Sequence, residues 1–389
     1  MNIRFLPVLG LMALAAHLPA AAQEAIEASR ETGATTPIAR FTPRETTSTA
    51  RVDYSFLDRA LDYMVLRMGI SSREGLSRPE PTIGSRQLYG HDSRYRLEGN
   101  RVVYSFLKDS EIEPLTDYLR ELEALGAQVD ITSLPREEQL AYWINLHNVA
   151  VIEAIARNYP LKSPSRMMLD GQRVVLDELK LVTVAGVSLS PRDIRTRIVF
   201  PNWSDPSVIY GFTRGEIGGP SIQRRAFTGE NAQELLDNSA REFVNSLRGV
   251  ESYGKELQVS RIYAEAAPFY FPALGDDLRE HLRLYAGEDV TGLIDSKPEL
   301  VINQYEDRIA DLAGGEREMV YSQVEIDGKP AGSMITPSIA RLLNERYEKL
   351  EKLRRRGELR GRVIVLTPPS AEEAAETGEA DEAEAAEAE

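Results

Sequence analysis

The strongest helical pattern of apolar residues covers residues 135–159. Its apolar positions recur every three or four residues and so share one face of a helix: Leu140, Trp143, Ile144, Val151 and Ile155. Ser133 is a candidate N-cap, and Pro160 predicts the end of the helix. Asn145, His147 and Asn148 lie on or beside the apolar face. These polar side chains either satisfy backbone groups of neighbouring loops or line a pocket.

The remaining pattern mixes helices with short strands and shows no regular alternation of strand and helix. Helices are predicted over residues 53–68, 111–125 (ended by Gly126), 191–199, 228–247 and 336–357, and from Ile262, Leu278 and Val290. Strands are predicted over residues 101–107, 207–213, 257–259 and 362–366, with hairpins in 173–190 and around Asp327–Gly328. This mixture predicts an α+β fold: a single globular domain over residues 51–366 whose central amphipathic helix packs on a small mixed or antiparallel sheet. A C-terminal extension begins at about residue 297.

The first residues are typical of a secretory signal peptide. Arg4 precedes an apolar run, and small residues before Gln23 predict cleavage near Ala22. Residues 23–50 are predicted to be a flexible leader. No later run is long and apolar enough to predict a transmembrane span. We therefore expect a periplasmic or secreted protein.

Composition narrows the possible chemistry. The chain has no Cys, which excludes disulfides and thiol catalysis. Residues 370–389 carry nine acidic side chains and no basic one, so an acidic, disordered tail over residues 367–389 accounts for much of the net charge of −15. Basic runs interleaved with aromatic residues do not occur, which argues against nucleic-acid binding.

Four motifs occur in a characteristic order: RVVYSFL from Arg101, REEQLAYWINLHNVAVIEAIARNYPL from Arg136, AGVSLSPRDIRTRIV from Ala185 and DPSVIYGFTRGEIGGPSI from Asp205. Through them, residues 101–290 resemble the domain of unknown function 547 family (DUF 547). That family occurs in exported bacterial proteins and at the C-terminus of some plant leucine-zipper proteins. The resemblance implies an exported bacterial member.

The chain departs from this family where chemistry would be expected. Related members usually carry Cys-x-x-x-x-Cys-Pro, and the two Cys positions are Arg214 and Gly219 here. The family's Asp-Ile-Glu-His segment ends in Arg195 and Thr196, and the usual Tyr of the WINLYN segment is His147. A Cys and a His could act as nucleophile and base, so this chain lacks both partners of such a pair.

The glycine-rich turn over residues 214–220 is the second candidate for a site. Its amides could form an anion-binding nest, and Arg214 suits a carboxylate or phosphate. The alternative is a structural turn in which Arg214 and Glu216 pair or face solvent. We expect the turn to lie beside the helix over residues 135–159, with His147 or Asn148 facing it. The predicted binding residues are Asn145, His147, Asn148, Arg214, Gly218 and Gly219.

Other catalytic and metal patterns are missing from the sequence. Ser221 follows the turn without a nucleophile elbow. No HExxH pattern occurs, and His281 is expected to be solvated, so neither a metal nor a cofactor is predicted.

Three functions remain open. The first is a non-catalytic binding or scaffold domain whose partner is a small anionic ligand or an envelope protein. The second is a hydrolase-like envelope enzyme with a non-thiol site that uses His147 and Glu216. The third is an envelope structural protein that makes contacts through its acidic tail.

Overall fold

The computed structural model describes residues 37–80, 88–169, 171–317, 323–326, 329–332 and 336–359. The chain divides into two compact units, Met1–Leu342 and Leu343–Glu389. The first is an α+β domain in which helices predominate and strands form small sheets, so the predicted class is confirmed. Among the described residues, no helix combines the length and apolarity that crossing a membrane requires.

The helices and helical turns differ widely in length. The α-helices are α2 (Ser55–Met64), α3 (Asp109–Gln128), α4 (Arg136–Arg157), α5 (Pro191–Asp193), α6 (Phe200–Asn202), α7 (Ala232–Val244), α8 (Ile262–Tyr270), α9 (Leu274–Tyr285), α10 (Glu288–Ser296) and α11 (Pro337–Arg355). The short 3-10 turns are η1 (Pro37–Phe41), η2 (Tyr104–Phe106), η3 (Ile131–Ser133), η4 (Pro164–Arg166), η5 (Leu176–Glu178) and η7 (Pro206–Gly211), and η6 (Ile194–Val199) is a π-helix.

The strands form one mixed sheet and four two-stranded pairs. Their bounds are β1 (Val65–Leu66), β2 (Arg101–Val102), β3 (Met167–Leu169), β4 (Gln172–Val174), β5 (Val182–Val184), β6 (Val187–Leu189), β7 (Val250–Tyr253), β8 (Glu256–Ser260), β9 (Glu299–Gln304), β10 (Gln323–Ile326) and β11 (Lys329–Gly332). In the three-stranded sheet, β8 pairs antiparallel with β7 and parallel with β9. The other pairs, β1–β2, β3–β4, β5–β6 and β10–β11, are antiparallel.

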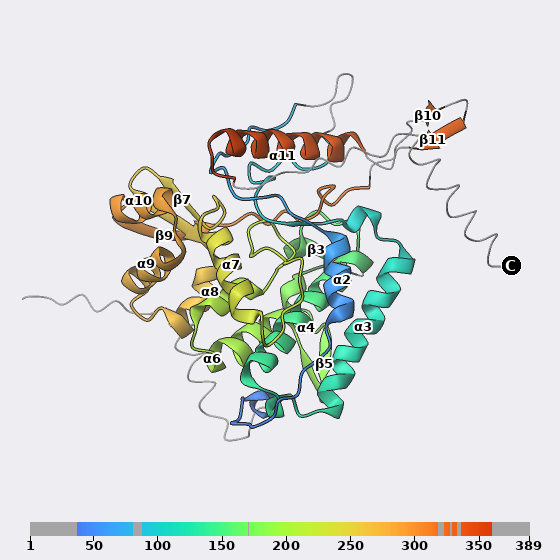
Figure 1. The fold of residues 1–389 in the computed structure, drawn as a ribbon, viewed down its shortest axis with the longest axis vertical. Helices are drawn as coiled ribbons and strands as arrows, with labels where there is room; N and C mark the ends of the chain where they lie inside the picture. Colours follow the sequence, from blue (N-terminus) through green and yellow to red (C-terminus); the bar gives the residue numbers. More distant parts are fainter. Residues whose placement is uncertain are drawn as a thin grey trace, which may run out of the picture. The chain divides into compact units, whose positions relative to one another are not determined.

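Helix α4 lies at the centre of the domain and is buried on nearly every side (Figure 1). It packs against α3, α5 and α7, against the turns η3 and η5, and against the π-helix η6. The central helix of the predicted α+β domain is thus present, and its main neighbours are helical elements, which explains why polar as well as apolar residues along it are buried. Pro135 is its N-cap residue, whereas the Ser133 hydroxyl donates to the Asp130 carbonyl at 2.6 Å.

Two predicted strands are mainly helical turns. Residues 207–213 were expected to form an apolar strand, but Pro206–Gly211 is η7. The Asp205 carboxylate accepts a hydrogen bond from the Ser207 amide at 2.8 Å, and Pro206 occupies the first turn, so the local sequence starts a helix. Residues 101–107 contain only the short strand β2, followed by η2.

Helix α3 continues past the glycine that was expected to end it. A β-carbon on Gly126 would lie 2.4 Å from Val184 Cγ1 and 2.8 Å from the Tyr142 hydroxyl oxygen. Glycine is therefore needed here for close packing rather than for a left-handed helix end.

The described part of the predicted flexible leader packs on the domain. Phe41 of η1 is buried, and its ring meets the Trp143 ring edge-to-face at 5.0 Å between centroids. The predicted signal peptide, the hairpin residues Asp327 and Gly328, the strand over residues 362–366 and the acidic tail lie outside the described residues.

Candidate functional site

A pocket of about 360 Å³ opens beside the glycine-rich turn. Its walls come from η4, the end of β4, η5, the turn, the residue before α8, and the chain after β9. The lining residues are Pro164, Ser165, Arg166, Arg173, Val175, Leu176, Asp177, Arg214, Glu216, Arg261, Tyr305 and Asp307. Arginines and carboxyl groups therefore dominate the lining.

A buried ion-pair network lies directly behind this pocket. The Arg195 side chain, 1% exposed, donates to both Asp177 oxygens at 2.7 and 2.6 Å. It also donates to both Glu265 oxygens at 2.8 and 3.1 Å. Burial opposes the ionisation of both acids, but the Arg195 charge outweighs it and holds the pKa of Asp177 and of Glu265 below the usual range.

Arg214 joins the same network from the turn. Its guanidinium lies 3.1 Å from Glu265, so two arginines share this carboxylate. The predicted alternative of an Arg214–Glu216 pair is not what the structure shows, because Arg214 pairs with Glu265. Arg214 also lines the pocket, and therefore connects it to the buried network.

His147 is enclosed within this network and does not line the pocket. Its side chain is fully buried, its Nδ1 lies 3.0 Å from Asn148 Oδ1, and its Nε2 lies 2.9 Å from Arg195 Nη1. Because Asn148 Oδ1 can only accept and the guanidinium can only donate, the network assigns the proton to Nδ1. Burial and the Arg195 charge lower the pKa of His147 to about 3, so the ring is neutral.

The two asparagines of α4 satisfy backbone groups of adjacent segments. Asn145 bonds the amide and carbonyl of Phe227 at 3.0 and 2.7 Å. Asn148 accepts from the Thr213 amide at 3.0 Å and donates to the Gly211 carbonyl at 2.9 Å. Asn148 therefore ties helix α4 to Gly211 and Thr213, which lead into the turn, and not to the turn itself.

The glycine-rich turn is paired with the chain segment 305–311. The amides of Ile217 and Gly218 donate to the Arg308 and Glu306 carbonyls, each at 2.8 Å, and Gly219 donates to Glu216 at 3.2 Å. The amides of Gly218 and Gly219 are thus not free for the predicted anion nest. A β-carbon on Gly218 would lie 2.4 Å from the Glu306 nitrogen, which explains the glycine.

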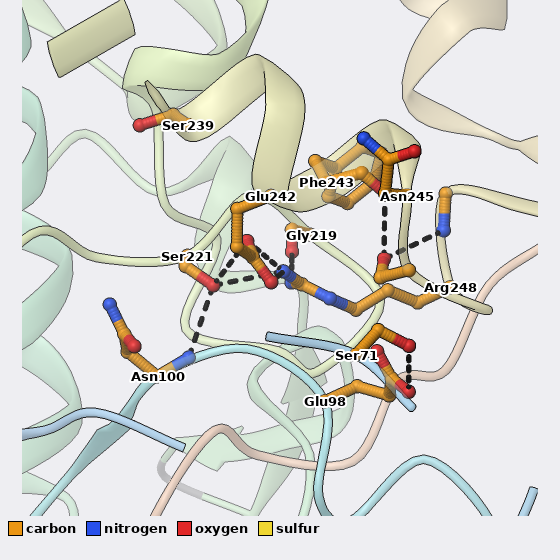
Figure 2. Close-up of polar contacts among 12 residues, drawn as sticks. Ser71, Glu98, Asn100, Gly219, Ser221, Ser239, Glu242, Phe243, Asn245 and Arg248 are labelled. Atoms are coloured by element: carbon orange, nitrogen blue, oxygen red, sulfur yellow. Dashed lines mark hydrogen bonds and ion pairs between the residues drawn. The ribbon is translucent and has the colours of Figure 1, made fainter. Parts of the chain in front are cut away.

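Arg248 supports the turn from its other side (Figure 2). Its guanidinium donates to the Gly219 carbonyl and to the Ser221 hydroxyl, and Glu242 neutralises its charge. Ser221 also donates to Glu242 at 3.0 Å and accepts from the Asn100 amide at 3.1 Å. The Ser221 oxygen is fully engaged in this network, which gives it a structural role.

Glu216 is the carboxyl group of the pocket whose pKa is raised toward neutral pH. Its oxygens accept from the Ser165 amide at 2.9 Å and the Tyr305 hydroxyl at 2.6 Å. Burial raises the pKa of Glu216 to about 7, because these hydrogen bonds and the nearby Arg214 only partly offset the desolvation of the carboxylate. Near neutral pH this carboxyl group is therefore partly protonated.

Two arginines of the pocket are exposed and lack a carboxylate partner. Among the residues that the structure describes, neither Arg173 nor Arg261 forms an ion pair. By contrast, Arg166 pairs with Asp307. The sequence alone does not single out Arg173, Arg261 or Tyr305, because nothing in their spacing indicates a common pocket.

No group of metal-ligating side chains occurs in the described part of the chain. His281 is buried rather than solvated, which corrects the sequence-based expectation. Its Nε2 lies 2.8 Å from the Tyr210 hydroxyl, and burial lowers its pKa to about 4. Its partner, Tyr210, belongs to η7, so this contact joins α9 to an element that lies 71 residues earlier in the sequence.

Part of the chain is similar to a known protein family. Residues 131–244 match the family described as protein of unknown function, DUF547. No curated protein and no solved structure matches the chain. The matched range includes α4, the buried Arg195 and the glycine-rich turn, whereas Arg261 and Tyr305 lie beyond it. Residues 131–244 of the chain therefore form a region that is similar to the DUF547 family.

Proposed function

We propose that the chain is a non-catalytic binding domain that takes a small anionic ligand in the pocket beside Arg214. This proposal rests on which charged side chains of the pocket lining have a partner of opposite charge. Arg166, Arg214 and Asp177 all have partners of opposite charge, whereas Arg173 and Arg261 have none among the described residues. An anion would supply the missing partner.

Two observations support binding rather than catalysis. The chain has no Cys for a thiol nucleophile. Both ring nitrogens of His147 are engaged, by Asn148 and Arg195, and the ring does not line the pocket. A general base has to reach the proton that it abstracts, and His147 is enclosed.

The test is a calorimetric titration of the whole chain with acetate and with inorganic phosphate at low ionic strength. We expect saturable binding that weakens at least about tenfold in Arg173→Gln or Arg261→Gln, since each change removes a charge-assisted contact. Arg59→Gln is the matched control, because Arg59 is an exposed arginine on α2 outside the pocket. Undetectable binding of both anions, or equal affinities in all variants, would overturn the proposal.

A second candidate, a hydrolase-like enzyme, is favoured by one observation. Glu216 lines the pocket with a pKa raised to about 7, which suits a general acid or base. Turnover of an ester, amide or peptide library by the wild-type chain, abolished in Glu216→Gln, would establish this function in place of simple binding.

We also propose that the chain acts outside the cytoplasm. The support is the N-terminal sequence alone, in which Arg4 precedes an apolar run and small residues end at Ala22. Mass spectrometry of the protein recovered from a bacterial host should show an N-terminus at Gln23. An intact Met1 on the recovered protein would contradict export.

A further inference from the structure

We infer that the ligand of this pocket is a monocarboxylic acid with an aliphatic chain of several carbons. Its carboxylate binds at Arg173 and Arg261, and its chain lies on the β3–β4 hairpin. This inference rests on the proposed anion-binding function and names the chemical class of the ligand.

The hairpin places apolar and cationic side chains on one face. Met168 on β3 and Arg173 on β4 are direct cross-strand partners, so their side chains project from the same side of the pair. Val175 follows Arg173 by two residues in extended backbone, with φ −102° and ψ 112°, and so shares that side.

The apolar side chains on this face are available to a ligand. Met168 is 60% exposed and Val175 is 36% exposed. Val175 lines the pocket together with Arg173, and the adjacent Leu176 and Pro164 extend the apolar wall inward. A ligand that carries only charge would leave this wall in water, whereas an aliphatic chain would cover it.

The balance of charges in the lining favours a single negative charge on the ligand. The lining contains four arginines and three carboxyl groups, Asp177, Glu216 and Asp307. Above about pH 7, where Glu216 is ionised, the net surplus is one positive charge. A dianion or a phosphate monoester would face repulsion from these carboxyl groups, and a monocarboxylate would neutralise the surplus.

The volume of the pocket guides the choice of a probe. At roughly 30 Å³ per water-sized group, about 360 Å³ accommodates about a dozen non-hydrogen atoms. An eight-carbon acid has about this size, so octanoate is a suitable probe.

The test compares octanoate, acetate and octan-1-ol by calorimetric titration of the whole chain. We expect octanoate to bind at least about tenfold more tightly than acetate, because each fully buried methylene contributes about fourfold and the wall is only partly enclosing. Octan-1-ol lacks the charge and should bind more weakly than octanoate by a similar factor.

Substitutions on the hairpin separate the apolar contribution from the ionic one. The double variant Met168→Thr, Val175→Thr should lose most of the octanoate advantage while its acetate affinity stays unchanged. Tyr253→Thr, which changes a 74% exposed residue on β7 outside the pocket, is the matched control and should bind octanoate normally.

The two proposals fail in different ways. Equal affinities for octanoate and acetate, or an octanoate advantage that persists in the double variant, would overturn the aliphatic ligand and leave anion binding intact. Absence of binding by both acids and by inorganic phosphate would overturn the anion-binding function itself.

Discussion

Glu216 is buried with hydrogen bonds to Ser165 and Tyr305, so its protonation is linked to folding. Its pKa is raised to about 7 in the folded chain from an ordinary value of 4.5. Between these values the folded state holds a proton that the unfolded state releases. The stabilisation that protonated Glu216 gives the folded state is therefore fully present below pH 4.5 and is lost as the pH rises to about 7.

We predict that Glu216→Gln removes this dependence. We compare the free energies of unfolding of the variant and the wild type. The variant's value relative to that of the wild type should rise by about 3 kcal/mol between pH 4 and pH 8, because the pKa difference is about 2.5 units. Urea unfolding at both pH values measures it. The difference between the two proteins is needed because His147, with a lowered pKa, destabilises the chain in the opposite direction, as pH falls below 6.5. An unchanged difference would refute the raised pKa of Glu216.

Arg195 provides a second prediction at the residue scale. Arg195→Met should lower the free energy of unfolding by about 3–5 kcal/mol, because Asp177 and Glu265 would remain as buried carboxylates without their main counter-charge. Arg192→Met is the control, since Arg192 is 56% exposed and its pair with Glu178 should be worth about 0–1 kcal/mol. Equal losses in chemical denaturation would argue against the network as a stabilising unit.

The limits of prediction from sequence are clearest for single residues. Arg195 was recognisable as a departure from the family pattern, but its partners Asp177 and Glu265 are 18 and 70 positions away. Their association depends on how η5, η6 and α8 pack, which periodicity does not encode. Asn145 and Asn148 satisfy backbone groups of Phe227 and Gly211. This could be established only from the positions of those residues in the fold.

At the scale of elements, the contact between α4 and the glycine-rich turn depends on Gly215. Its φ is +70°, and a β-carbon there would lie 2.2 Å from Ile155 Cδ1 and 3.5 Å from Val151 Cγ1. Both side chains are buried in α4 and have little room to move.

We predict that Gly215→Ala destabilises the chain by about 2–5 kcal/mol, through backbone strain and overpacking together. Gly254→Ala is the matched control: its φ is also positive, at +56°, but nothing lies within 4 Å of an added β-carbon. The control should therefore show only the strain, about 1–2 kcal/mol. Thermal unfolding of both variants measures the difference, and similar midpoints would show that the contact with Ile155 is not restrictive.

Long periodic elements were the most predictable from sequence. Helices α2, α3, α4 and α7 occur where the apolar spacing indicated them, because each has a face that must be buried. Residues 207–213 were misassigned because a fully buried apolar run of this length is compatible with a strand or a helical turn. Asp205 and Pro206 contained the information that decides between them.

At the scale of the whole molecule, the acidic C-terminal sequence has almost nothing to bury. We predict that removing residues 370–389 leaves the thermal midpoint unchanged, since these residues are nearly all Ala and Glu. Differential scanning calorimetry of the full and truncated chains measures it. A midpoint lower by several degrees in the truncated chain would show that the tail is docked.

The class of the fold was predictable from sequence, but the composition of the pocket was not. Its lining is drawn from residues between Pro164 and Asp307, and the chain segment after β9 contributes two of its side chains. The sequence placed an extension from about residue 297 without indicating that it completes this site.

The pairing of residues 305–311 with the glycine-rich turn has a consequence for the modularity of the family. A gene fragment limited to residues 131–244 would encode the family signature but lose Tyr305, Asp307 and the acceptors of the Ile217 and Gly218 amides. The signature alone therefore does not specify the whole pocket, although nine of its twelve lining residues lie within residues 131–244. The family signature and the pocket lining are therefore encoded in stretches of this chain that overlap only in part.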